Sequence, residues 1–183
     1  MTLITETNKL VEACERFSRD TFLAIDTEFM RERTYYPQLC LIQIAGNSDA
    51  VIVDALANEI NLNPILDLMA NQQVTKVFHA CRQDMEILFN LNRKISFPVF
   101  DTQIGALVCG YGESISYYKL VRQITGIQID KSSRFTDWSH RPLSKQQLNY
   151  ALSDVTHLRT VYEALLKQLE KNRRISWLDE EFQ

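Results

Sequence analysis

Short apolar runs that end in polar residues predict five strands along the chain. The runs cover residues 21–29 (TFLAIDTEF), 39–45 (LCLIQIA), 50–55 (AVIVDA), 74–80 (VTKVFHA) and 98–102 (PVFDT). Runs of this length bounded by turn residues are typical of buried strands. Residues 46–49 (GNSD) predict a hairpin turn, so we expect the first three strands to form an antiparallel meander.

The segments between and after these runs predict helices. We expect helices over roughly 5–18, 62–71 and 82–92, and two more that stop at Gly110 and Gly126. The longest helix should cover about 144–171, where Ser144 and Gln147 have the spacing of a capping box. Together these elements predict one α/β domain, in which helices flank a mixed five-stranded sheet.

Composition narrows the protein class. The chain has 183 residues, 45% of them apolar, which suits one well-buried core. It has no uncharged apolar run of about 18 residues, so we expect no membrane span. Its N-terminus lacks the basic and apolar regions of a secretory signal, and we therefore expect a cytoplasmic protein. The four cysteines are too scattered for a zinc site.

The formal net charge of −3 excludes a strongly basic nucleic-acid-binding protein. Basic residues nevertheless outnumber acids between residues 119 and 145. That segment is compatible with a phosphate-facing surface and equally with an ordinary solvated one, and charge alone leaves both readings open.

Two carboxylates emerge side by side at the end of the first predicted strand. Asp26 and Glu28 are two residues apart, so their side chains share one face of that strand. Two unpaired carboxylates at close range repel each other, and a divalent cation between them removes the repulsion. Hard oxygen ligands suit Mg²⁺ or Mn²⁺. Alone, the pair is more typical of a polar strand end than of a metal site.

Two further positions carry candidate chemistry. Tyr150 and Asp154 lie four residues apart and share one face of the last predicted helix. Asp84 falls in the first turn of the helix that follows the fourth strand, close to a strand end, where ligands gather in α/β sheets. Each feature alone has an ordinary structural explanation, such as an acid that favours a helix N-terminus.

The order of these residues resembles the DEDD exonuclease superfamily, in the branch with a tyrosine in its third motif. The motifs are similar to DTEF at Asp26–Phe29, FHACRQD ending at Asp84, and YxxxD at Tyr150–Asp154. The chain is most similar to the catalytic domain of the ribonuclease D family, through YYPQLCLIQIA, FDTQIGA and DWSHRPLSKQQLNYALSDV as well. The resemblance covers about residues 20–178.

This resemblance implies a ribonuclease H-like fold, two Mg²⁺ or Mn²⁺ ions and 3′–5′ trimming of single-stranded RNA to 5′-monophosphates. It implies that Asp26 bridges both ions, that Glu28 and Asp154 complete the tighter site, and that Asp84 holds the second ion, largely through water. Tyr150 would orient the attacking water and the scissile phosphate. A phenol with an ordinary pKa near 10 is a better positioner than a base at neutral pH.

Other residues have secondary claims. Thr27, Phe29 and Met30 lie beside the acids and are candidates to touch the terminal base, although Phe29 is equally a core residue. His79 is a weaker candidate for a general base and is more readily a residue that shapes the site. Three basic residues precede the third motif and are candidates to grip phosphates: Arg134, Arg141 and Lys145. For Trp138 we favour packing, and for His157 packing or a place at the rim.

The resemblance to the ribonuclease D family also implies that helical HRDC domains follow the catalytic domain. The sequence ends at Gln183, so we expect a single domain over 1–183 without HRDC. We accordingly expect weak, salt-sensitive RNA binding and a homodimer or a partner that supplies further RNA-binding surface. Precursor tRNA ends are the substrate that the resemblance suggests.

Three alternatives remain. A DNA-directed exonuclease shares the same acids and differs in its contacts to the ribose 2′-hydroxyl. A non-catalytic nucleic-acid or protein-binding module on the same fold is expected to lose some acids, whereas all four and the tyrosine are present. A glycosidase explains Asp26 and Glu28 but leaves Asp84, Tyr150 and Asp154 without a role.

Overall fold

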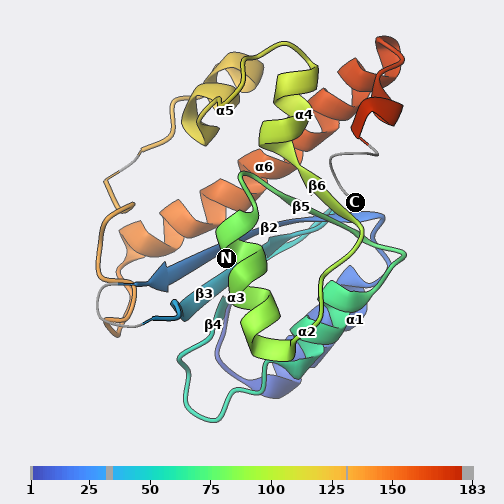
Figure 1. The fold of residues 1–183 in the computed structure, drawn as a ribbon. Coiled ribbons are helices and arrows are strands. Elements are labelled where there is room, and N and C mark those ends of the chain that lie inside the picture. Colours follow the sequence, from blue (N-terminus) through green and yellow to red (C-terminus); the bar gives the residue numbers. More distant parts are fainter. Residues whose placement is uncertain (1, 32–34, 131, 179–183) are drawn as a thin grey trace.

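A mixed sheet forms the centre of the computed structural model, which describes residues 2–31, 35–130 and 132–178 (Figure 1). Within these residues the strand order is β1 (Thr2–Ile4), β4 (Ala50–Asp54), β3 (Gln38–Ala45), β2 (Phe22–Met30), β5 (Thr75–Phe78) and β6 (Val99–Asp101). The antiparallel meander of β2, β3 and β4 is confirmed. Strands β5 and β6 extend the sheet in parallel from β2.

The prediction of five strands is wrong by one. Strand β1 pairs in parallel with β4 at the edge of the sheet, with Leu3 opposite Ile52. It has only three residues, which is too short for an alternating pattern to appear in the sequence. Its pairing with β4 depends on a contact some fifty positions away, and no local pattern records such a contact.

The helices lie close to their predicted positions. They are α1 (Thr7–Phe17), α2 (Asn63–Ala70), α3 (Arg82–Asn92), α4 (Thr102–Val108), α5 (Tyr117–Thr125), α6 (Lys145–Lys171) and a 3₁₀ turn at Ile175–Leu178. The capping box that starts α6 is confirmed, because Ser144 accepts from the Gln147 amide and the Gln147 side chain accepts in return. Every described helix is too short or too polar to cross a bilayer.

Strand β2 separates two apolar cores. Leu23 and Ile25 pack in one core with residues of α1 and α2, whereas Phe22 and Ala24 pack in another with residues of the long helix α6. This alternation follows from the period of two along a strand. Asp26 and Glu28 continue the row of Phe22 and Ala24, so their carboxylates point toward α6 just where the apolar packing ends.

One buried cation braces the sheet away from this row. Lys76 on β5 is 0% exposed, and its ammonium donates to the carbonyls of Asn71, Val74 and Phe97 at 2.8, 2.8 and 2.6 Å. All three ammonium hydrogens therefore have an acceptor. The side chain ties the segment after α2 and the segment before β6 to the strand between them.

We predict that Lys76→Met lowers the free energy of unfolding by at least about 2 kcal/mol, because three buried carbonyls lose their donor. Urea unfolding followed by circular dichroism measures the change. The exposed Lys119→Met is the matched control and should unfold like the wild type. Equal stability of the two variants would contradict the bracing role.

Candidate active site

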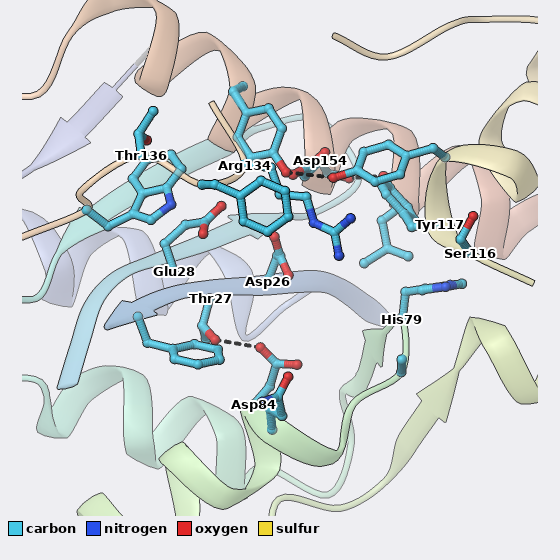
Figure 2. Close-up of a pocket in the computed structure, with 18 of the residues that line it drawn as sticks. Asp26, Thr27, Glu28, His79, Asp84, Ser116, Tyr117, Arg134, Thr136 and Asp154 are labelled. Carbon is cyan, nitrogen blue, oxygen red and sulfur yellow. Dashed lines mark hydrogen bonds between the residues drawn. The ribbon is translucent and has the colours of Figure 1, made fainter. Parts of the chain in front are cut away.

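Three elements meet in a cleft of about 690 Å³ (Figure 2). Strand β2 contributes Asp26 and Glu28, helix α6 contributes Tyr150 and Asp154, and the first turn of α3 contributes Asp84. The strand period and the four-residue helical spacing place each pair on one face. All five residues that the sequence assigned to chemistry therefore line one cleft.

The acids divide into a group of three and one that stands apart. Asp26, Glu28 and Asp154 each offer a carboxylate oxygen, and these oxygens lie within 4.8 Å of one another. Oδ1 of Asp154 is buried and has no hydrogen-bond partner among the described residues. Asp84 approaches from α3, where it accepts a 2.5 Å hydrogen bond from Thr27 (Figure 2).

Burial raises the pKa of every acid in the cleft, and repulsion from neighbouring cleft acids adds to the rise at Asp26 and Glu28. Burial is the largest cause throughout, and it is reinforced at Asp26 by Asp154 and Asp84 and at Glu28 by Asp26. The pKa of Glu28 rises to about 10 and that of Asp154 to about 7. The pKa of Asp84 rises to about 6, with the Thr27 hydrogen bond acting in the opposite direction. Arg134 opposes the rise at Glu28 and Asp154.

Tyr150 is held on two sides. Its hydroxyl lies 2.9 Å from that of Tyr118 on α5, and its ring centroid lies 6.0 Å from that of the buried Trp138. Burial and the nearby Asp154 raise the pKa of Tyr150 well above its usual value. The phenol therefore keeps its proton at neutral pH. Trp138, only 2% exposed, packs as expected.

Several residues with secondary claims also line the cleft: Thr27, Phe29, Met30, His79 and Arg134. The hydroxyl of Thr27 is engaged by Asp84, and the side chain is buried. The Nδ1 atom of His79 lies 3.0 Å from Thr102 Oγ1, and burial lowers the histidine pKa. His157 lies in a neighbouring groove behind Tyr150.

Arg141 and Lys145 do not line the cleft. Arg141 donates from Nε and Nη2 to the two carboxylate oxygens of Asp54, at 2.7 and 2.6 Å. Its Nη1 also donates to the carbonyls of Trp138 and His140, and its Nη2 to the carbonyl of Cys40. These contacts hold the guanidinium within the fold. The expectation that Arg141 binds phosphates in the cleft is therefore corrected. Lys145 is exposed at the first residue of α6.

Sequence reasoning missed two tyrosines at the start of α5. The hydroxyl of Tyr117 donates to the backbone carbonyl of Asp154, and Tyr118 meets Tyr150. The only local signal is the aromatic pair in SISYYKL, which also reads as ordinary helix packing. Gln43 was missed as well. It lies opposite Asp26 in the β2–β3 ladder, is 0% exposed, and has no hydrogen-bond partner among the described residues.

Comparison with known proteins fits this geometry. The family model described as 3′–5′ exonuclease matches residues 1–170. The chain belongs to the 3′–5′ exonuclease family. It is 54% identical over 181 residues to ribonuclease D of Bartonella henselae and 52% identical over 183 residues to that of Nitrobacter hamburgensis, covering 99% and 100% of this chain. It spans 45% and 48% of those two relatives, about half of their length.

Structural comparison of this exonuclease-family chain gives the same relationship. The crystal structure of Escherichia coli RNase D, described as an exoribonuclease involved in structured RNA processing, superimposes with a TM-score of 0.92 at 35% identity. The match covers 98% of this chain and 48% of that one. The ribonuclease H-like α/β fold expected from the sequence is thereby confirmed.

We predict that Arg141→Met lowers the free energy of unfolding by at least about 2 kcal/mol, because it leaves the buried Asp54 carboxylate without its cationic partner. The double variant with Asp54→Asn should recover part of the loss. Chemical denaturation measures both. A variant as stable as the wild type but weaker in RNA binding would instead restore the phosphate role.

A second prediction concerns pH. Because the pKa of Asp154 is raised to about 7, the folded, metal-free protein binds more protons than the unfolded chain between about pH 4 and 7. The free energy of unfolding therefore falls as pH rises through that window. Asp154→Asn removes this penalty and should raise the melting temperature in EDTA by at least about 3 °C at pH 8, and by less at pH 5.

Thermal unfolding at the two pH values measures the effect, with the exposed Asp67→Asn as the matched control. A gain of equal size at pH 5 and pH 8, or a loss at pH 8, would show that Asp154 carries no ionisation penalty in the fold.

Proposed function

We propose that the chain is a 3′–5′ exoribonuclease that removes nucleotides one at a time from single-stranded RNA. The observation that carries this proposal is the convergence of Asp26, Glu28 and Asp154 oxygens within 4.8 Å in a cleft that also holds Asp84 and Tyr150. The ribonuclease D relatives support RNA as the substrate class.

The donor set fits divalent cations. Carboxylate oxygens are the ligands that Mg²⁺ and Mn²⁺ prefer, and the raised pKa values of the acids indicate a strong need for positive charge. Oδ1 of Asp154, which has no hydrogen-bond partner within the described part of the chain, is available as a ligand atom. Asp26, Glu28 and Asp154 would hold one ion. Asp84, with Asp26 shared, would hold a second.

The reaction breaks one phosphodiester bond. A water oxygen attacks the phosphorus, the bond from phosphorus to the 3′-oxygen of the penultimate nucleotide breaks, and a nucleoside 5′-monophosphate leaves. The shortened RNA keeps a 3′-hydroxyl that takes up a proton. When bound, the cations would lower the pKa of the attacking water and stabilise the leaving oxygen.

The residues of the chain orient the substrate for this step. Tyr150 stays protonated because its pKa is raised, so its hydroxyl donates toward the water or a phosphate oxygen. Arg134 is exposed at the cleft and offers a cation to a phosphate. Phe29 and Met30 line the wall beside Glu28, where a terminal base can stack without regard to its identity.

Two finer points belong to the same proposal. Processing of precursor tRNA ends in the cytoplasm is the physiological role we propose. Because the formal net charge is −3, we further propose that a homodimer or a partner supplies additional RNA-binding surface.

We predict a ladder of products shortened from the 3′ end when 5′-labelled single-stranded RNA is incubated with the protein and Mg²⁺ or Mn²⁺. EDTA should abolish the ladder. Asp26→Asn should reduce the rate by more than about 100-fold, because the central acid of the cluster loses its charge. Denaturing gel electrophoresis over a time course measures the rates.

A DNA oligonucleotide of the same sequence runs beside the RNA. Faster cleavage of DNA would shift the assignment to a DNA-directed exonuclease. A folded protein that cleaves neither strand with either ion would contradict the catalytic proposal and favour a binding module.

A further inference from the structure

The contact between Tyr118 and Tyr150 joins two helices at the floor of the cleft. Tyr118 is the second residue of α5, Tyr150 lies in the second turn of α6, and their hydroxyl oxygens are 2.9 Å apart. Both rings line the cleft that holds the acids. Tyr118 belongs neither to the three exonuclease motifs nor to the basic residues expected to bind phosphates.

Tyr118 is itself held in place. The Arg134 guanidinium lies over its ring at 5.6 Å from the centroid, and the ring of Tyr117 meets it edge-on at 5.9 Å. Leu120, two residues further along α5, is 0% exposed and fixes that helix on the core. The Tyr118 hydroxyl is therefore presented to Tyr150 by a fixed ring.

The direction of the hydrogen bond follows from the donors available. A phenol has one hydrogen, and an ionised carboxylate only accepts. Either hydroxyl could donate across the contact, but in the proposed function the one hydrogen of Tyr150 goes to the attacking water or to a phosphate oxygen, so Tyr150 can only accept from Tyr118. The 2.9 Å contact is then made by the hydrogen of Tyr118, and the hydrogen of Tyr150 remains directed toward the water or the reacting phosphate.

We propose that Tyr118 is a positioning residue for Tyr150, which donates to the Tyr150 oxygen and so directs the Tyr150 hydroxyl into the cleft. The inference rests on the proposed function, in which Tyr150 orients the water and the phosphate. In this proposal Tyr118 influences the reaction through its contact with Tyr150. A misdirected hydroxyl slows the chemical step without altering how the RNA strand is held.

The test is a double-mutant cycle on single-stranded RNA with Tyr118→Phe, Tyr150→Phe and both together. Phenylalanine keeps the ring that Arg134 covers and removes only the hydroxyl. Tyr118→Phe should lower kcat by about 5- to 10-fold and leave KM unchanged, as expected for one lost hydrogen bond. In the Tyr150→Phe background the same change should have no effect, because the group it acts through is absent.

Tyr111→Phe is the matched control, since that ring packs against the core beside α4 and should leave kcat and KM unchanged. A second readout does not depend on activity. In protein labelled with ¹³Cζ-tyrosine, the resonance that disappears in Tyr150→Phe should shift in Tyr118→Phe and stay in place in Tyr111→Phe.

Equal losses of kcat in both backgrounds, a change confined to KM, or a stationary Tyr150 resonance would each overturn the positioning role. A wild-type protein that cleaves neither RNA nor DNA would overturn the proposed function instead. The resonance shift alone would then decide whether Tyr118 sets the Tyr150 hydroxyl.

Discussion

Repulsion among buried carboxylates is the constraint on which the rest of the structure depends. Four acids line one cleft, three of them with oxygens inside 4.8 Å, and burial raises the pKa of each. Such an arrangement is unfavourable in the protein alone. The fold holds it because β2 and α6 are fixed by apolar cores on both sides of the sheet. Divalent cations held by these acids would remove the repulsion.

Local sequence rules predicted the parts of the site that belong to one element. The alternation along β2 places Asp26 and Glu28 on one face, and the helical spacing does the same for Tyr150 and Asp154. The capping box at Ser144 fixes where α6 begins. The periodicity of two elements, β2 and α6, therefore predicted most of the motif geometry without any knowledge of tertiary contacts.

Contacts between distant elements could not be predicted in the same way. The pairing of Arg141 with Asp54 spans 87 positions, and nothing near either residue indicates it. The Tyr118 contact spans 32 positions and joins two helices whose relative placement depends on the core. Resemblance to a family supplied the roles of the motif acids, but it did not reveal which basic residues the fold itself uses.

The cations that brace the fold are different residues from the candidate substrate-facing cation. Lys76 and Arg141 hold loops to the sheet through backbone carbonyls, and Arg141 also neutralises Asp54. Arg134 instead lies exposed beside Glu28 and Asp154, against the ring of Tyr118. This division explains how a chain with a net charge of −3 can still present positive charge at the one place where a phosphate would arrive.

The measurement that tests this account most directly is a crystal structure of the protein grown with Mn²⁺, with an anomalous difference map. We expect a peak coordinated by Asp26, Glu28 and Asp154, and a second between Asp26 and Asp84 when RNA is bound. A map without a peak in the cleft at saturating Mn²⁺, in crystals where the three acids keep their positions, would contradict the claim that these acids form a cation site.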